Sequence, residues 1–345
     1  MKTRLLQQDT YGELLGRKSL EEFIASLSAT PYKPEIEVAL SKYGGFPCVA
    51  EALRRHFSHT MSLIKSFFEG PPRSLIDTVL ARWDLFNLKA ILRGRIIGIS
   101  SQEITDAVVP AGEFGGAELE ETARQVDLEA SVALIAARHA EYAQPLAEAI
   151  SVYGEHQDLS LLELALDKFY YDRVMRRTRG IDNNAALVRE LIGAEIDLNN
   201  MMMVLRLCGR EGIREELQER YGAGDFSPLL IASGETLSFQ RLSQLDPSAT
   251  REEAMQQMAG TPYGRILTSF TNGSLPRIER ELERYVTHLG IDMFFRDPLG
   301  IAIPLGYIWA KENELRNLRI IARYKARGLG AEQIREELIL VPRLG

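Results

Sequence analysis

The stretch ELRNLRIIARYKARG at Glu314–Gly328 combines an acid, an asparagine and basic side chains with aliphatic ones, and it occurs in three versions. The second is DLFNLKAILRGRIIG at Asp84–Gly98, and the third is DLNNMMMVLRLCG at Asp197–Gly209. Counted from the opening acid, each version has asparagine at +3, apolar residues at +4 and +7, and arginine at +9. The repeated polar positions are Asp84, Asn87 and Arg93, then Asp197, Asn200 and Arg206, then Glu314, Asn317 and Arg323. The versions begin 113 and 117 positions apart, which is about a third of the chain each time.

Short flanking segments are also repeated. TPY at Thr30–Tyr32 returns at Thr261–Tyr263, and VVPAGE at Val108–Glu113 resembles LIASGE at Leu230–Glu235 and LVPRLG at Leu340–Gly345. A long internal repeat of this kind decides the architecture before any single motif does. We therefore predict three related helical modules, at residues 1–115, 116–232 and 233–345, of which the middle one has diverged most.

The pattern of apolar residues predicts an all-α fold. Apolar residues recur every three or four positions between short Gly/Pro loops, as in Leu161–Arg177, whereas alternating β-patterns are nearly absent. Ser19 followed by Glu22 is typical of a helix start, and Pro276 opens another predicted helix. A chain of 345 residues also exceeds what one compact core usually serves, so two or three units are expected.

The repeated helix places its apolar residues on one face. In the first version Leu88 and Ile91 belong to a stripe about 120° wide, which must pack against other elements. The acid and the asparagine are expected in the first turn of the helix, where a carboxylate interacts favourably with the helix dipole and an amide can bond free N–H groups or an adjacent loop. The arginine points away, toward solvent or a neighbouring module. Because an active site uses one asymmetric arrangement of residues, a set written three times is interpreted as structural, with a partner-facing role for some arginines as the alternative.

Composition and motifs argue against several function classes. The net charge of −7 and the pI of about 5.5 do not favour a nucleic-acid surface. Two cysteines, Cys48 and Cys208, cannot form a disulfide framework or a four-ligand zinc site, and we expect them to be buried thiols. The sequence has no nucleotide-binding glycine motif, no H-E-x-x-H and no G-x-S-x-G, and His56 with His59 is a weak metal signal. We therefore predict no catalytic residue, no cofactor and no metal site.

The sequence also shows neither a signal-peptide pattern nor a membrane-spanning apolar segment. The N-terminal residues lack the apolar core of a signal peptide, and no apolar run approaches the eighteen or so residues of a spanning helix. Any membrane role is therefore expected to pass through a partner.

Four segments together resemble one known family. They are Asp84 to Arg93, LELALDKFYYD at Leu162–Asp172, EIDLNN at Glu195–Asn200, and DPLGIAIPLGYIWAKENELRNLRII at Asp297–Ile321. In order and spacing they resemble the C subunit of archaeal and bacterial V/A-type rotary ATPases, the counterpart of the vacuolar d subunit. Members of that family usually have a longer N-terminal lead, and this sequence departs from them there.

The resemblance implies a non-catalytic subunit of the central stalk. Its three modules would form a funnel with pseudo-threefold symmetry, which holds the foot of the central shaft and sits on the membrane rotor ring. The subunit would be cytoplasmic and peripheral to the membrane through that ring. Loops that recur once per module, at Gly112–Gly116 and Gly222–Gly234, are the candidate contacts with shaft or ring.

The sequence is compatible with two alternative functions. One is a stand-alone helical-repeat scaffold for protein partners, although such solenoids repeat every 20–50 residues rather than every 115 or so. The other is a helical enzyme, which would need a polar cluster that occurs only once.

Overall fold

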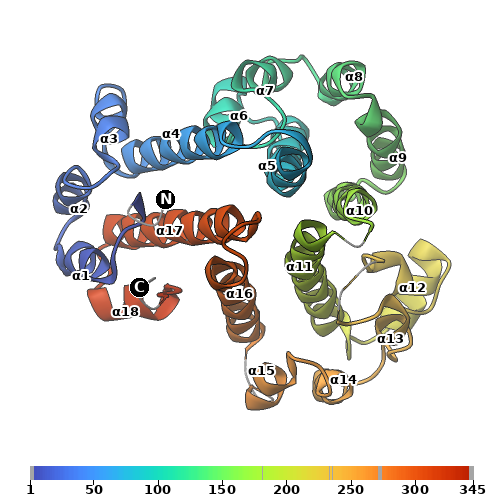
Figure 1. The fold of residues 1–345 in the computed structure, drawn as a ribbon. Coiled ribbons are helices and arrows are strands. Elements are labelled where there is room, and N and C mark those ends of the chain that lie inside the picture. Colours follow the sequence, from blue (N-terminus) through green and yellow to red (C-terminus); the bar gives the residue numbers. More distant parts are fainter. Residues whose placement is uncertain (1–3, 181, 233, 235, 271–273, 342–345) are drawn as a thin grey trace. The chain divides into compact units, whose positions relative to one another are not determined.

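The computed structural model describes residues 4–180, 182–232, 234, 236–270 and 274–341. Every regular element within those ranges is a helix, and none of the described residues forms a strand, so the prediction of an all-α fold is confirmed (Figure 1). Contacts divide the chain into two compact units, one made of Met1–Arg124 with Gly290–Gly345 and the other of Gln125–Leu289. The division into three modules stays a prediction.

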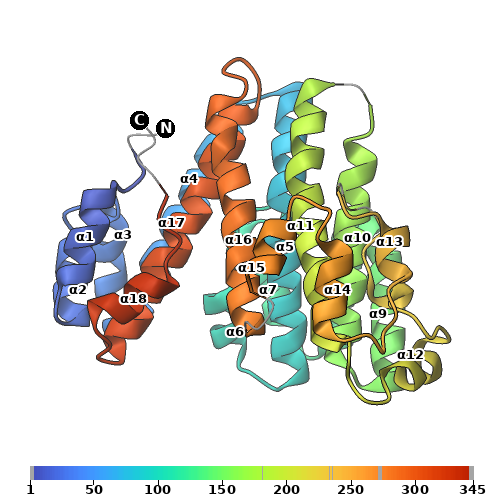
Figure 2. The same cartoon turned by 90° about the horizontal axis from the view of Figure 1, so that it is seen from below.

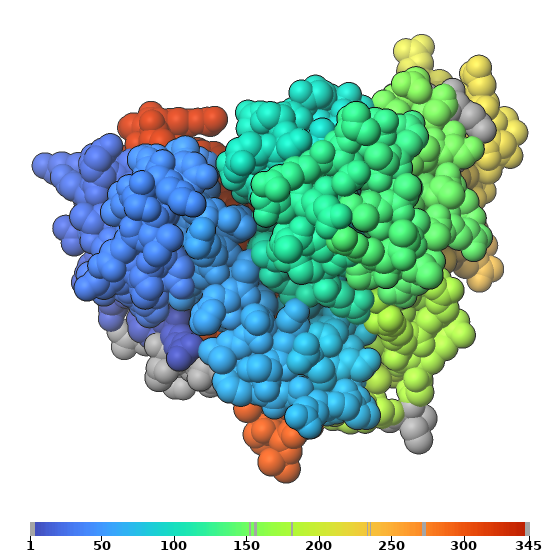
Figure 3. Space-filling view, turned by 90° about the horizontal axis from the view of Figure 1, so that it is seen from above, coloured from blue at the N-terminus to red at the C-terminus, as the bar shows by residue number. Residues whose placement is uncertain are grey.

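The first unit joins the two ends of the chain. It contains α1 (Gln8–Gly16), α2 (Leu20–Leu27), α3 (Lys33–Leu40), α4 (Gly45–Ser66), α5 (Gly70–Ile96), α6 (Ser101–Ala107) and α7 (Gly116–Ala123), and then the 3-10 turn η3 (Met293–Phe295), α17 (Ala302–Ala326) and α18 (Ala331–Glu337). Helix α17 packs along α4, and α18 packs against α1, as Figures 1 and 2 both show. Helices α3 and α4, in blue, form part of this unit's surface in Figure 3.

The second unit contains α8 (Leu128–Arg138), α9 (Ala140–His156), α10 (Leu159–Arg177), α11 (Asn183–Leu207), α12 (Ile213–Tyr221), the 3-10 turn η2 (Ser227–Leu229), α13 (Phe239–Ser243), α14 (Arg251–Met258), α15 (Gly264–Ser269) and most of α16 (Leu275–Asp292). Helices α8, α9 and α10 pack successively side by side. Its core includes Met201 and Val204 of α11, packed with Phe226, Met255 and Ile278. Of the three consecutive methionines of α11, Met201 and Met202 lie in this core and Met203 packs against it partly buried.

The three copies of the repeat lie on α5, α11 and α17, whose lengths are 27, 25 and 25 residues. The expectation that the acid and asparagine lie in the first turn is wrong, because each helix begins twelve or more residues before its acid. In α5 the prolines that follow Gly70 open the helix, and the buried residues Ile76 and Val79 carry it onward. The acids therefore lie far from their own helix's free N–H groups and must find partners elsewhere.

Several local predictions are confirmed. Ser19 caps α2 by accepting a hydrogen bond from the backbone N–H of Glu22, and Pro276 lies in the first turn of α16. Cys48 and Cys208 are buried free thiols. Within the described part of the chain, no helix is both long and apolar enough to span a bilayer.

Candidate functional site

The three repeat asparagines make the same pair of hydrogen bonds. Each side-chain amide donates its N–H to one backbone carbonyl and accepts the backbone N–H of that same residue, and we call this arrangement the asparagine bracket. Distances are 2.8 and 2.7 Å for Asn87 with Val109, 2.9 and 2.8 Å for Asn200 with Ile231, and 2.9 and 3.2 Å for Asn317 with Ile339. All six residues are buried. Because buried peptide groups are costly to leave unpaired, each bracket fixes a loop onto its repeat helix.

The first acid receives two backbone N–H groups. Asp84 is fully buried and accepts hydrogen bonds from the N–H of Glu113, at 2.6 Å, and of Phe114, at 3.0 Å. Lys65 approaches the same loop and donates to the carbonyl of Gly112 at 2.6 Å. The loop is thus fixed to α5 at two places, at Val109 by Asn87 and four residues later, at Glu113, by Asp84.

The second acid repeats this arrangement and adds a tyrosine. Asp197 accepts from the N–H of Thr236, at 3.0 Å, and of Leu237, at 3.2 Å. The hydroxyl of Tyr263 donates to the same carboxylate at 3.0 Å. Tyr263 ends the second TPY segment, so this flanking repeat serves the repeat helix directly.

The third acid takes its partners from the opposite end of the chain. Glu314 accepts from the N–H of Leu6 at 2.5 Å and from the hydroxyl of Tyr32, the tyrosine of the first TPY segment, at 2.7 Å. Buried Lys311, one turn earlier on α17, donates to it at 2.5 Å and lies 4.6 Å from the centre of the Tyr32 ring. This acid therefore fastens the N-terminal segment to the C-terminal helix.

Burial changes the acid–base behaviour of these groups. It raises the pKa of Asp84 to about 7, against the lowering effect of the two backbone N–H groups. Burial, and then the charge of Glu314, raises the pKa of Tyr32 well above its usual value. Burial and the charge of Asp197 raise the pKa of Tyr263 in the same way. Both tyrosine hydroxyls consequently stay protonated and act as donors.

Two glycines allow the loops to approach the acids. A Cβ atom added to Gly112 would lie 2.2 Å from Oδ1 of Asp84, and one added to Gly234 would lie 2.1 Å from Oδ1 of Asp197. These glycines therefore correspond to one another, as the similarity of VVPAGE and LIASGE predicts.

The third loop is aligned differently from the sequence-based expectation. Aligning LVPRLG with VVPAGE places Val341 at the position of Val109. In the structure, however, Asn317 bonds Ile339, two positions earlier. The rest of that segment, residues 342–345, lies outside the described part of the chain.

The three repeat arginines are exposed, unlike the acids and asparagines. Arg206 pairs with Glu279 at 2.6 Å, and the guanidinium of Arg323 lies 5.8 Å from the centre of the Phe46 ring. Arg93 is exposed on α5. The nine repeat residues thus separate into six that are buried, the three asparagines of the brackets and the three acids, and three arginines at the surface.

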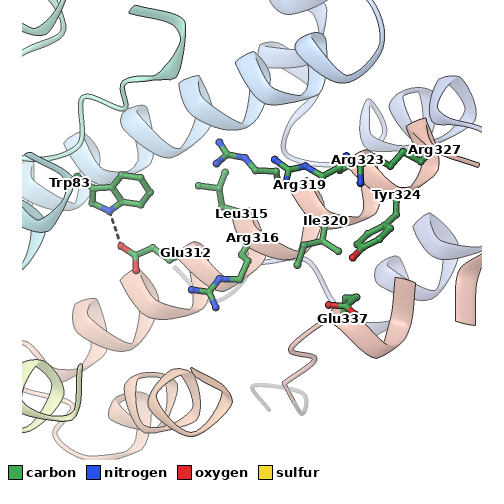
Figure 4. A pocket seen from close by; sticks show the side chains of 10 residues that line it. All are labelled: Trp83, Glu312, Leu315, Arg316, Arg319, Ile320, Arg323, Tyr324, Arg327 and Glu337. Carbon is green, nitrogen blue, oxygen red and sulfur yellow. Dashed lines mark hydrogen bonds between the residues drawn. The ribbon is translucent and has the colours of Figure 1, made fainter. Parts of the chain in front are cut away.

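A basic hollow of about 400 Å³ opens beside the last repeat helix (Figure 4). Its wall includes Arg319, Arg323 and Arg327 of α17, which Figure 4 shows side by side along the helix, and also Trp83 and Tyr324. Burial, and then the neighbouring charge of Arg323, lowers the pKa of Arg319. Sequence reasoning named only Arg323, but the recurrence of arginine every four residues in this stretch is a signal that could have identified the row.

Comparison with known proteins gives one consistent result over nearly the whole chain. The profile of the ATP synthase (C/AC39) subunit family matches residues 1–337. The C subunit of the A-type ATP synthase of Methanosarcina mazei is 27% identical over 347 residues, covering 99% of this chain and 90% of the relative. Proteins of that description from Methanocaldococcus jannaschii and Haloquadratum walsbyi are 25% and 26% identical over 342 residues each, covering 97% of this chain and 83% and 94% of the relatives.

Proposed function

The chain belongs to the ATP synthase (C/AC39) subunit family, and from this premise we propose that it couples the rotor shaft of the soluble head to the ion-translocating ring in the membrane. In this role it is a non-catalytic subunit of the central stalk of a rotary ATPase, it lies in the cytoplasm, and it reaches the membrane through the ring. Its partners are the shaft subunits and the rotor ring.

The threefold asparagine bracket is the observation that carries this proposal. A part that transmits torque must resist deformation, and each bracket adds two buried hydrogen bonds that join a loop to a long helix. Close packing around such sites has low compressibility. Repetition on α5, α11 and α17 supports three equivalent modules, at residues 1–115, 116–232 and 233–345, as parts of a funnel with pseudo-threefold symmetry.

We assign a structural role to the buried repeat residues. Asp84 and Asp197 each accept two backbone N–H groups, and Glu314 fastens the N-terminal segment, so their hydrogen-bonding capacity is used within the chain. Exposed Arg93, Arg206 and Arg323 are the members of the set that a partner can reach. Loops at Gly112–Gly116 and Gly222–Gly234 remain candidate contacts with shaft or ring. Gly112 and Gly234 themselves lie against the side chains of Asp84 and Asp197.

Co-purification tests the proposal. The tagged full chain, isolated from native membranes at low salt, should bring down the shaft subunits and the rotor ring. A polar, detachable interface should lose the shaft as the salt concentration rises, because screening weakens exposed charge pairs. Shaft binding that is unchanged between low and high salt contradicts the polar interface. Recovery of unrelated proteins, with neither shaft nor ring, contradicts the coupling role and favours the scaffold alternative.

A further inference from the structure

The basic hollow beside α17 contains a linear array of positive charge, formed by Arg319, Arg323 and Arg327, which we call the arginine row. On a helix these positions share about 80° of arc and extend about 12 Å along the axis. Figure 4 shows the three side chains following one another along α17 at the edge of the hollow. The chain as a whole has a net charge of −7, so the positive charge of the row is opposite in sign to that of the chain.

The carboxylates of Glu312 and Glu337 line the same hollow as the row. No ion pair joins Arg319, Arg323 or Arg327 to a carboxylate among the described residues. Glu312, which also lines the hollow, already accepts from Nε of Arg82 at 3.1 Å and from the Trp83 indole at 2.8 Å. Holding like charges together is unfavourable, most of all at Arg319, which is partly buried, and a bound polyanion relieves that repulsion.

The geometry decides which anion fits best. A single phosphate group reaches one or two guanidinium groups, whereas three arginines spaced by four residues match carboxylates spaced by four residues on a second helix. Leu315, Ile320 and Trp83 also line the hollow, and these apolar surfaces favour a side-chain-bearing polypeptide. A flat bilayer surface is poorly matched to a concave site.

We infer that the arginine row docks an acidic helical segment of a protein partner. The inference rests on the proposed function in one respect, because it takes that partner to be another subunit of the rotary complex. Aspartate or glutamate side chains at four-residue spacing would pair with the guanidinium groups, and apolar residues beside them would cover Ile320 and Trp83.

A model helix provides the test with the full chain. The probe is a fluorescein-labelled synthetic helix with three glutamates at four-residue spacing in an alanine and glutamine background. Its matched control has the same composition, with the glutamates distributed around the helix. Fluorescence anisotropy at 10 mM and 150 mM salt should show binding of the spaced helix, weaker binding of the control helix, and loss of affinity as salt screens the charges.

Two charge-reversal variants identify the surface. Arg323→Glu with Arg327→Glu changes two exposed positions of the row, and Lys18→Glu with Lys42→Glu changes the net charge equally at exposed positions elsewhere in the first unit. The row variant should weaken binding of the spaced helix at least about tenfold at 10 mM salt, whereas the lysine variant should change it less than about twofold. Arg319→Gln, measured beside them, should also weaken binding while circular dichroism keeps its helical signal.

Several results overturn the inference. They are no binding of the spaced helix by the unmodified chain, equal binding of the two helices, and equal loss in the row and lysine variants. Binding of inorganic phosphate or of phosphatidylglycerol vesicles that depends on the row, without binding of the helix, assigns the row to a different anion. If the chain recovers shaft and ring from membranes but does not bind the helix, only this inference fails. If the helix binds and neither subunit is recovered, the proposed function fails instead.

Discussion

The asparagine brackets make a quantitative prediction about Asn200. Among the described residues, both the N–H and the carbonyl of Ile231, which is 5% exposed, have Asn200 as their partner, and replacing Asn200 with alanine removes it. Each buried group left unpaired costs about 1–3 kcal/mol, so the free energy of unfolding should fall by about 2–6 kcal/mol. Asn87→Ala should cost only about 1–3 kcal/mol, because the carbonyl of Val109 also accepts from the N–H of Ala111 at 2.8 Å and only the Val109 N–H loses its partner.

The third bracket should respond as the first does. The carbonyl of Ile339 accepts from Nδ2 of Asn317 at 2.9 Å and also from Nδ2 of Asn313 at 2.8 Å. Asn317→Ala therefore leaves this carbonyl paired, and only the Ile339 N–H loses its partner. The expected cost is about 1–3 kcal/mol, as at Asn87 and roughly half of the cost at Asn200.

Hydrogen exchange reads these effects locally. The amides of Val109, Ile231 and Ile339 are the bracket donors, so exchange followed by mass spectrometry of the peptides that contain them should show faster exchange in the matching variant. Denaturant unfolding gives the accompanying free energies, and Gln256→Ala, at an exposed position of α14, is the control and should stay within about 0.5 kcal/mol of the parent. A cost below about 1 kcal/mol for Asn200→Ala, or a cost for Asn317→Ala as large as that for Asn200→Ala, would refute the reasoning.

Three further predictions concern the acids. Gly112→Ala places a Cβ 2.2 Å from Oδ1 of Asp84 and should cost about 1–3 kcal/mol in denaturant unfolding, whereas Gly116→Ala, whose Cβ meets nothing closer than 3.7 Å, should be nearly neutral. Burial raises the pKa of Asp84 from 3.8 to about 7, so the stability that its protonation contributes is complete below pH 3.8 and is lost as pH rises through 7. The free energy of unfolding of Asp84→Asn should therefore fall less between pH 5 and 8 than that of the parent. An equal fall in the two proteins would contradict this. Tyr263→Phe removes the 3.0 Å bond to buried Asp197 and should lower the free energy of unfolding by about 1–3 kcal/mol, so an unchanged unfolding curve would show that this hydroxyl contributes nothing.

Local sequence patterns predicted the elements well because the forces involved are local. The stripe of Leu161–Arg177 corresponds to α10, at Leu159–Arg177, and the Ser19 cap lies where its Ser-x-x-Glu spacing indicates. The correspondence of asparagines was also visible, because offsets along one helix are independent of the rest of the fold. What each asparagine bonds was not visible, because Val109 and Ile231 lie 22 and 31 residues after their partners.

The error about the first turn has a specific cause. Sequence reasoning began each helix at the acid, where a carboxylate gains from the helix dipole, and it did not count the apolar positions upstream. In α5 the residues from Leu75 to Leu80 are mostly buried, so packing extends the helix well before Asp84. The acid then contributes by accepting N–H groups from a distant loop, which no pattern within one helix can reveal.

The third copy shows how chain connectivity accounts for a departure within the repeat. Asp84 and Asp197 reach loops that follow them in the chain, whereas Glu314 reaches Leu6 and Tyr32, 308 and 282 residues away. Its partners arrive with the N-terminal segment. Glutamate is one methylene longer than aspartate, which allows one carboxylate to meet a backbone N–H, a tyrosine hydroxyl and the ammonium group of Lys311 together. The TPY tyrosines support this comparison, because Tyr32 and Tyr263 each donate to the acid of the repeat helix near them. The change from aspartate to glutamate therefore marks the helix at which the two ends of the chain are joined.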